Sequence, residues 1–317
     1  MPSVDVIVPV YNEEACILEL GRRLAAVMDS APDYEWRIVL VENGSMDQSS
    51  ALIRGLSERD SRFHELQLIR NFGTEGGILA GLAAATADVA ITMQADLEDP
   101  PELIPEMLAA WRRGALYVYA SVQGREHLPA WRRAMTSAYY RLASWASDGG
   151  ITPNASDYRL LDRQLYELIN NIPEQNLFLR GLVTWAGFPS AAVPFSRGMR
   201  FAGETKFRLR SVIGFASRGI LAQSAKPLKL ITGFGAILSA LSVVGLIVLT
   251  WGALFRSVPF GGFGTIVGLQ VLFFGLTMLI LGLVSEYIAL IYIEVRPRPH
   301  FIVRKGEAEE RLDDPGV

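Results

Sequence analysis

The 317-residue sequence has little of what disulfide-bonded proteins and histidine-based zinc proteins need. It contains one cysteine, Cys16, so no disulfide can form within the chain, which is typical of a reducing compartment. Its three histidines are scattered along the chain, at His64, His127 and His300. We therefore exclude a disulfide scaffold and a zinc centre built from histidines.

Two common nucleotide-binding motifs are also missing. No GxGxxG follows the first predicted strand and no GxxxxGK[ST] occurs anywhere, which disfavours a dinucleotide fold and a P-loop. The net charge is −3, and no basic stripe interleaved with aromatic residues is present. We therefore expect no nucleic-acid partner.

Charged side chains are absent from two long stretches, 230–255 and 257–285. Each stretch exceeds the roughly 20 residues that a helix needs to cross the bilayer core. We predict two transmembrane helices, at about 228–254 and 264–292. A buried helical hairpin in a soluble protein is the alternative, and the length of both uncharged stretches disfavours it.

Basic residues flank the two predicted spans. Those outside the spans are Lys226, Lys229, Arg296, Arg298, Arg304 and Lys305. The connecting loop carries only Arg256. Because positive residues favour the cytoplasmic side, we expect a multi-pass protein of the cell inner (plasma) membrane with its soluble domain and both termini in the cytoplasm.

The first hundred residues alternate between short apolar runs and amphipathic segments. The runs predict buried strands at 4–10, 36–41, 66–69 and 89–93. Helices are predicted between them, from about Glu13, from about Ser49, and over the alanine-rich segment 76–87. The alternation predicts an α/β fold with a mostly parallel sheet and helices on both faces. Ligands of such sheets bind beyond the carboxyl ends of the strands, which here are 9–14, 42–47, 70–77 and 94–99.

We predict that the chain divides into four parts. A soluble domain covers 1–202, an amphipathic segment 203–227, the two spans 228–293, and a tail 294–317. Within the soluble domain a further strand is expected at 116–122 and a helix at 130–146. The mixture of apolar and basic residues before the first span suits helices lying in the anionic membrane interface, although a core helix would show the same pattern.

Several motifs occur together and in a defined order: VIVPVYNEE, VENGSMDQS, RNFGTEGGILAGL, QADLEDPPELI, SDYRLLDRQ and RGMRFAGETKF. On these motifs the chain resembles the inverting family 2 glycosyltransferases with a GT-A, Rossmann-like fold, over about residues 4–304. Within that family it resembles the polyisoprenyl-phosphate glycosyltransferases, mainly bactoprenol glucosyltransferases and more distantly dolichol-phosphate mannose synthases. The resemblance implies a homo-oligomeric membrane enzyme that moves one hexose from a nucleotide-diphosphate sugar, UDP-glucose being expected, to a polyprenyl phosphate such as undecaprenyl phosphate.

The resemblance also implies the residues of the nucleotide-sugar site. They are Pro9, Tyr11, Asn12, Glu13, Glu42, Gly44, Ser45, Gln94, Arg200 and Lys206. Many relatives carry two aspartates where this chain has Glu42 and Asn43. As structure alone, the residues after the first strand could stop the strand and cap a helix, and Gly44 with Ser45 could serve only a turn.

The resemblance places a Mg²⁺ or Mn²⁺ site at the acidic end of the fourth strand. Relatives usually have Asp-x-Asp-x-Gln where this chain has Gln94, Asp96 and Glu98. We expect Asp96 to be the principal ligand and a catalytic residue, Glu98 to be a substitute second ligand, and Gln94 to offer an amide oxygen. On an extended segment these side chains would point to one side, and Asp99 would cap the following helix. A capped and solvated loop is the alternative.

Asp157 matches the family's aspartate near the acceptor, so the resemblance implies that it is catalytic. It would act as a base or orient the acceptor, and a structural pair with Arg159 is the alternative. The acceptor phosphate is expected at Arg125, Arg133 and Ser137, although Arg132 or Arg141 could replace Arg133.

Three other functions compete with this hypothesis. A processive polysaccharide synthase is disfavoured because no Gln-x-x-Arg-Trp motif occurs. A transferase of mannose or an amino sugar would show the same motifs. A catalytically impaired scaffold is suggested by Glu42, Asn43 and Gln94.

Overall fold

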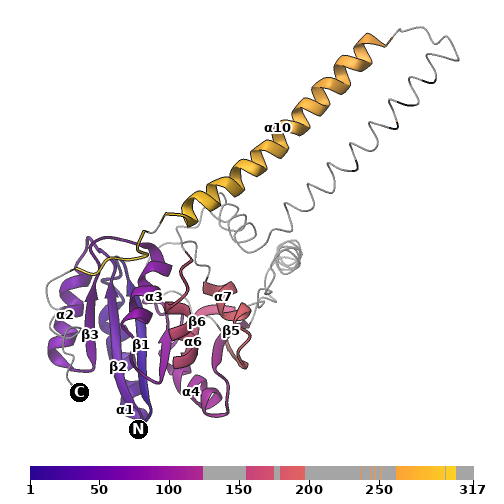
Figure 1. Ribbon diagram of the computed structural model, residues 1–317. Coiled ribbons are helices and arrows are strands. Elements are labelled where there is room, and N and C mark those ends of the chain that lie inside the picture. Colours follow the sequence, from indigo (N-terminus) through magenta and orange to yellow (C-terminus); the bar gives the residue numbers. More distant parts are fainter. Residues whose placement is uncertain are drawn as a thin grey trace.

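The computed structural model describes residues 1–123, 155–174, 179–196, 262–296 and 298–304, and four single positions between 237 and 251. It shows an α/β domain from which one long helix projects (Figure 1). The predicted helix 130–146, the amphipathic segment 203–227 and nearly all of the first predicted span lie outside the described residues.

Seven described strands form one sheet in the order β3-β2-β1-β4-β6-β5-β7. They are β1 (Ser3–Val10), β2 (Glu35–Glu42), β3 (Phe63–Gln67), β4 (Val89–Thr92), β5 (Tyr117–Gln123), β6 (Ala155–Asp162) and β7 (Ser190–Ser196). Among them β6 runs antiparallel to β4 and β5, and the other neighbours are parallel. The predicted α/β fold with a mostly parallel sheet is confirmed.

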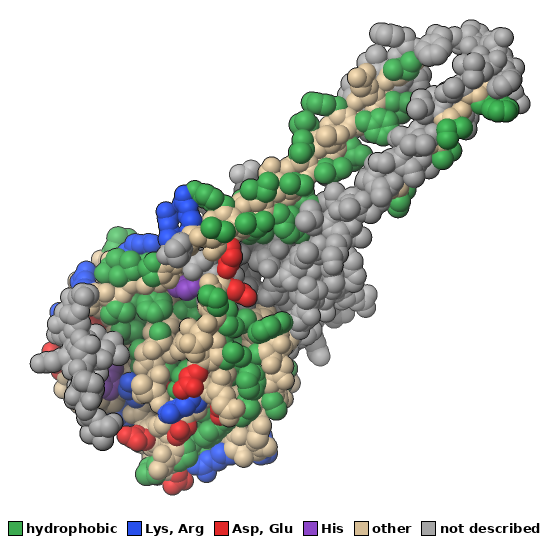
Figure 2. Space-filling view, viewed as in Figure 1, with side chains coloured by type: hydrophobic (Ala, Val, Ile, Leu, Met, Phe, Trp, Pro, Cys, Tyr) green, Lys and Arg blue, Asp and Glu red, His purple; other side chains and the backbone are tan. Residues whose placement is uncertain are grey.

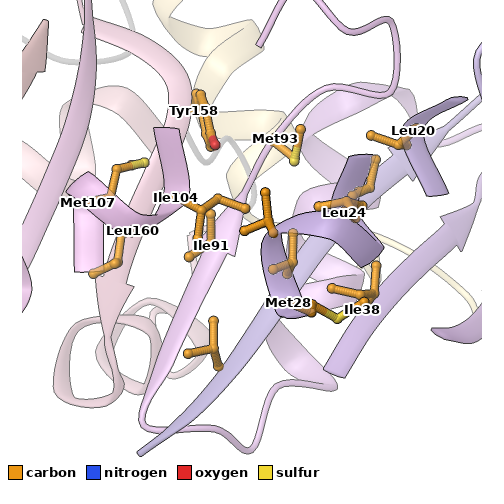
Figure 3. Packing of buried hydrophobic residues seen from close by; sticks show 14 of the residues in the cluster. Leu20, Leu24, Met28, Ile38, Ile91, Met93, Ile104, Met107, Tyr158 and Leu160 are labelled. Atoms are coloured by element: carbon orange, nitrogen blue, oxygen red, sulfur yellow. The ribbon is translucent and has the colours of Figure 1, made fainter. Parts of the chain in front are cut away.

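Helices cover both faces of the sheet, as predicted. The helices of the α/β domain are α1 (Ile17–Ser30), α2 (Ser49–Arg59), α3 (Gly73–Ala83), α4 (Ile104–Arg112), α6 (Arg163–Asn170) and α7 (Leu179–Trp185), with a short 3₁₀ turn η1 (Pro101–Leu103) before α4. Side chains of α1, α2 and α4 pack on one face, and those of α3, α6 and α7 on the other. Figure 3 shows the first core, where Leu24 of α1 lies near Ile38 of β2, and Ile104 of α4 lies near Ile91 of β4.

Some predicted boundaries were wrong by a few residues. The strand predicted at 66–69 begins earlier, at Phe63, because pairing with β2 starts there and the mixed, half-buried sequence FHELQ hides the signal. The first helix begins at Ile17 rather than Glu13. The helix predicted at 76–87 occupies 73–83.

Helix α3 lies unusually close to β1. A Cβ added to Gly81 would lie 2.1 Å from Cγ2 of Ile7, so this contact requires glycine. Alternating residues of a strand face opposite sides, and Ile7 belongs to the core beneath α3. The contact fixes α3 along β1 with its first residue, Gly73, near the carboxyl end of the sheet.

The long helix α10 (Phe263–Glu294) corresponds to the second predicted span. At 1.5 Å per residue its 32 residues extend about 48 Å. In the described part of the chain it is the one helix long and apolar enough to cross a membrane: its window 273–292 has a mean hydropathy of 2.0 and none of it is buried. Figure 2 shows hydrophobic side chains along its outside and a group of Lys and Arg side chains where it meets the α/β domain. The first predicted span, at 228–254, lies almost wholly outside the described residues and is not confirmed.

After α10 the chain returns to the α/β domain and pairs with the end of β3. Val303 forms an antiparallel bridge with Leu68, and the Ile69 N–H donates to the Ile302 carbonyl at 3.0 Å. Figure 1 shows the N-terminus at the far end of the sheet from α10. Because β1 to β4 are parallel, their carboxyl ends therefore lie at the edge from which α10 projects.

Candidate functional site

The loops after β1 and β2 are joined by hydrogen bonds between side chains and backbone. The Asn12 N–H donates to Ser45 Oγ at 3.2 Å, and Asn12 Oδ1 accepts from the Met46 N–H at 2.8 Å. The Glu13 N–H donates to Ser49 Oγ at 3.0 Å. Asn12 has a φ of 55°, a left-handed conformation that asparagine tolerates better than most residues. These contacts bring the predicted residues Asn12, Glu13 and Ser45 together.

The other predicted residues of this strand end lie close by. Pro9 is buried in β1, while Tyr11 is 36% exposed at the edge. The residue preceding α1 is Cys16, without a side-chain cap, so the alternative that Asn12 caps this helix is wrong.

Asp47 strengthens the joint between these loops, although the sequence motifs did not indicate it. Its carboxylate accepts from the N–H groups of Glu14 at 3.2 Å and Ser49 at 3.0 Å. Burial acts to raise the pKa of Asp47, but the hydroxyl and N–H of Ser49 and the N–H of Glu14 together lower it below the ordinary value. The cluster of Asp and Ser in NGSMDQSS was the signal that could have revealed this role.

Asn43 and Glu42, which differ from many relatives, have internal partners. Asn43 is 2% exposed, its Nδ2 donates to the Gly73 carbonyl at 2.9 Å, and its Oδ1 accepts from the Phe72 N–H at 2.9 Å. A carboxylate at this position could not donate the first of these bonds. Glu42 is also 2% exposed and accepts from the Ser45 N–H. Asn43 therefore joins β2 to the start of α3.

Gly44 is required by the backbone. Its φ is 73°, and a Cβ there would lie 2.6 Å from the carbonyl carbon of Arg70 and 2.7 Å from the Asn71 nitrogen. Both the left-handed conformation and the close approach exclude a larger residue. The turn interpretation explains this glycine fully, and contact with a nucleotide stays a prediction.

The acidic segment after β4 is a turn rather than the extended segment we predicted. The Glu98 N–H donates to Asp96 Oδ1 at 3.1 Å, and Leu97 between them has a φ of 61°. A left-handed leucine costs about 1–2 kcal/mol, and its buried side chain, 5% exposed, holds it there. Gln94, Asp96 and Glu98 are each half-exposed, while the residues between them are buried.

Asp99 closes this turn and does not cap the following helix, so that prediction was wrong. Pro100 precedes η1 and no side-chain cap is present. Asp99 is 1% exposed; its carboxylate accepts from the Gln94 N–H at 3.3 Å and from Ser156 Oγ at 3.4 Å. It thereby ties the acidic turn to the start of β6. The sequence pattern did not indicate this role of Asp99, because Ser156 reaches it only through β6, which runs antiparallel alongside β4.

Asp157 lies beside the acidic turn. Thr92 of β4 pairs with Arg159 of β6, and extending this antiparallel register by two residues brings Asp157 level with Gln94. Thr92 Oγ1 also donates to the Asp157 carbonyl at 2.9 Å. The Asp157 side chain is 34% exposed and forms an ion pair with Arg159 at 2.8 Å. The structural pair that we weighed as an alternative is therefore present.

The acidic turn has the donors that a hard divalent cation uses. Two carboxylates and one amide oxygen project half-exposed from it, and Mg²⁺ or Mn²⁺ needs only one or two carboxylates beside phosphates and water. Within residues 1–123 and the other described segments, no three His, Cys, Asp or Glu side chains form a closed metal cage. The donor set therefore fits a cation shared with a phosphate ligand.

Five predicted residues lie outside the described segments: Arg125, Arg133, Ser137, Arg200 and Lys206. The described residues thus contain both carboxylates expected to be catalytic and most of the expected nucleotide-sugar site. The expected acceptor-phosphate residues and the two diphosphate cations stay predictions.

The sequence matches a family model described as Glycosyl transferase family 2 over residues 5–182. It is 37% identical over 302 residues to an uncharacterized glycosyltransferase, YkcC, of Bacillus subtilis, which covers 95% of this chain and 93% of that protein. It is 33% identical over 305 residues to a prophage-derived bactoprenol glucosyl transferase of Shigella flexneri, covering 96% and 98% of the two chains.

The fold is similar to that of mannosyl-3-phosphoglycerate synthase from Rubrobacter xylanophilus. The TM-score is 0.50 at 15% identity, and the match covers 72% of this chain and 74% of that one. At this identity the likeness concerns the fold alone.

Proposed function

The chain belongs to glycosyl transferase family 2 and is a hexosyltransferase, and we propose that it moves a single hexose from a nucleotide-diphosphate sugar to a polyprenyl phosphate. UDP-glucose is the proposed donor and undecaprenyl phosphate the proposed acceptor. The similarity to bactoprenol glucosyl transferases over nearly the whole chain supports both choices. We further propose that the reaction takes place on the cytoplasmic face of the inner membrane.

The observation that carries this proposal is the position of α10. It projects from the edge of the sheet where the carboxyl ends of β1 to β4 gather, and the chain after it pairs with Leu68 at that edge. An apolar helix with no buried residue between 273 and 292 suits a lipid environment. The site would then face the headgroup region, where a soluble donor and a lipid-linked phosphate can meet.

The two joined loops are proposed to hold the nucleotide. Tyr11 offers an exposed aromatic ring beside Asn12 and Glu13, and Ser45 fixes the backbone of that loop. Because side chains already satisfy several of these loop N–H groups, the loops are rigid before any ligand arrives. Such preorganisation lowers the entropy lost on binding.

The acidic turn is proposed to hold the diphosphate end. Asp96 would be the principal ligand of Mg²⁺ or Mn²⁺, Glu98 the second, and Gln94 a neutral oxygen donor. Such a cation, when bound, neutralises the charge that develops on the nucleotide diphosphate as it leaves. Arg200 and Lys206 are proposed to bind the same phosphates.

The acceptor is proposed to attack without a strong base. An oxygen of its phosphate forms the new bond to the anomeric carbon while the bond to the nucleotide diphosphate breaks, which inverts the configuration and gives a β-linked product. A phosphate monoester has a second pKa near 6, so this oxygen is already a competent nucleophile at neutral pH. Arg125, Arg133 and Ser137 are proposed to position it, which contributes more than proton transfer.

The full chain, purified in detergent or nanodiscs, tests this proposal. It would be incubated with Mg²⁺, polyprenyl phosphate and radiolabelled UDP-glucose, GDP-mannose or a UDP-amino sugar, and the lipid extract would be counted. We expect labelled glycolipid with UDP-glucose, loss of label with EDTA, and none with the variant Asp96→Asn. Transfer from another donor would correct the sugar. No transfer from any donor would favour the scaffold alternative.

A further inference from the structure

Arg159 of β6 is a fully buried cation. It lies two residues along the strand from Asp157, which is at the proposed catalytic edge. It is 1% exposed, its Nε donates to the Ser156 carbonyl at 3.0 Å, and its Nη2 donates to Asp157 Oδ1 at 2.8 Å. Its Nη1 is buried and has no hydrogen-bond partner among the described residues. The Nε and Nη2 atoms of this buried guanidinium therefore donate hydrogen bonds, while Nη1 has no acceptor among the described residues.

Arg159 lies on the face of the sheet that α3, α6 and α7 cover. Its neighbour Tyr158 points into the core shown in Figure 3, so Arg159 faces the opposite side of the sheet. There Thr92 and Tyr119 are its cross-strand neighbours, and Leu161 is the next residue on the same face. Among the described acidic residues, Asp157 is the one that forms an ion pair with it.

Stability does not explain this arrangement. A buried ion pair is often no more stable than apolar side chains of similar volume, and an unsatisfied buried donor adds a further penalty. Asp157, the other half of the pair, is one-third exposed at the edge beside the acidic turn.

We propose that Arg159 is a positioning residue that acts on transfer only through Asp157. Its rigid, buried guanidinium fixes the orientation of the Asp157 carboxylate at the reaction centre. Because one carboxylate oxygen of Asp157 is bound by this fixed guanidinium, the geometry assigns Asp157 to orienting the acceptor or the sugar rather than to acting as the base. This inference rests on the proposed transfer reaction and decides between the two roles that the sequence left open for Asp157.

A double-mutant cycle tests the inference. We would measure kcat, the KM for the nucleotide sugar and the midpoint of thermal unfolding for Asp157→Asn, Arg159→Met and the double variant. Each single change is expected to lower kcat about a hundredfold with a change in KM below about threefold. The double variant is expected to be no slower than the slower single variant, because residues that act as one unit lose their effect together.

Stability should behave differently from activity. Asp157→Asn leaves Arg159 buried without its partner and is expected to lower the unfolding midpoint, whereas the double variant restores it. Arg159→Lys keeps a cation and is expected to recover about tenfold of the kcat lost in Arg159→Met. If Asp157→Asn does not fold, the comparison of Arg159→Met with the double variant carries the same test.

The matched control is a second ion pair in the same sheet, at the opposite edge. Arg37 binds Asp5, which is 1% exposed, through Nε at 2.7 Å and through Nη2. Arg37→Met combined with Asp5→Asn is expected to change stability and leave the kcat of the folded protein within about twofold.

The outcomes separate the two proposals. A double Asp157→Asn/Arg159→Met variant whose loss equals the product of the single losses would overturn the positioning role while the transfer function stands. A wild-type protein without transfer activity would overturn the proposed function, and the positioning role with it.

Discussion

The two halves of the carboxyl edge differ in how their polar side chains are used. In the half formed by the loops after β1, β2 and β3, Asn12, Asn43 and Asp47 bind backbone groups of neighbouring loops. In the half formed by the acidic turn, Asp96 and Glu98 are half-exposed around a left-handed leucine. The polar side chains of the first half join loops to one another, and we call this half the frame. The carboxylates of the second half are half-exposed, and under the proposed function they bind a cation.

This difference changes the meaning of the departures from the family pattern. Asn43 has a structural task that an aspartate could not perform in full, so it no longer suggests lost catalysis. Gln94 and Glu98 are half-exposed, so under the proposed function their exchange of amide and carboxylate would affect metal binding. The same kind of substitution has a structural explanation in one half, and in the other it is explained only by the proposed metal site.

The largest effect is expected from Asp96→Asn. Removing the principal carboxylate should lower kcat about a thousandfold, on the scale of losing a main charge-stabilising group. The matched control is Glu106→Gln, an exposed carboxylate on α4 away from the edge. Glycolipid formation and the midpoint of a Mn²⁺ titration are the measurements. Near wild-type transfer by Asp96→Asn would show that the acidic turn is not the metal site.

Among substitutions in the frame, Gly44→Ala is expected to lower the free energy of unfolding most. The left-handed backbone and the approach of the Arg70 carbonyl carbon to 2.6 Å predict a loss of about 3 kcal/mol in the free energy of unfolding. Gly55→Ala in α2 is the control, because a Cβ there meets nothing within 4 Å and should stabilise the helix slightly. Chemical denaturation measures both. Equal stability of the two variants would contradict the close approach.

Glu98→Gln tests whether the carboxylate absent at position 94 has been replaced at position 98. We expect a roughly tenfold to hundredfold fall in kcat at limiting Mg²⁺, and a higher Mg²⁺ concentration for half-maximal rate. Gln94→Asp should not raise turnover. An unchanged metal dependence in Glu98→Gln would refute the replacement.

Asn43→Asp tests the hydrogen bonds by which Asn43 joins β2 to the start of α3. The variant loses the donor to the Gly73 carbonyl and buries a charge, so we expect a loss of about 2 kcal/mol in stability. Asn71→Asp is the matched control, since Asn71 is exposed and its Oδ1 only accepts, from the Gly73 N–H at 2.7 Å. Thermal unfolding of both variants decides: a destabilised Asn71→Asp and an unaffected Asn43→Asp would reverse our assignment.

The smallest effect is expected from acid acting on Asp47. Hydrogen bonds hold its pKa in the folded protein below the ordinary value, so its contribution to stability is present above the ordinary carboxyl range and is lost as the pH falls through the folded pKa. Wild type should exceed Asp47→Asn by about 1 kcal/mol at pH 7, and the difference should shrink below about pH 4. Urea denaturation at several pH values measures it; a difference that grows in acid would contradict the sign.

Much of the fold could be predicted because strong local patterns fix it. The β-branched runs of β1, β2 and β4 placed these strands correctly, and their parallel order brings the loops that follow them to one edge of the sheet. The start of β3 was missed because FHELQ is half-buried and mixed in polarity. The role of Asp99 was missed because its partner Ser156 is 57 residues away and reaches it only through the antiparallel strand β6.

The acidic stretch 94–99 was recognisable from its residue types, but its shape was not. A turn closed by Asp99 and pinned by buried Leu97 depends on contacts with β6 and the core, which no local pattern encodes.

The sequence by itself determined the apolar runs, the alternating elements and the ordered motifs, because each depends on residues close together in the chain. The tertiary structure alone decided that Asn43 belongs to the frame, that buried Arg159 pairs with Asp157, and that α10 projects from the edge where the carboxyl ends of β1 to β4 lie. Those facts depend on strand order and on one antiparallel strand, which bring residues far apart in the chain into contact.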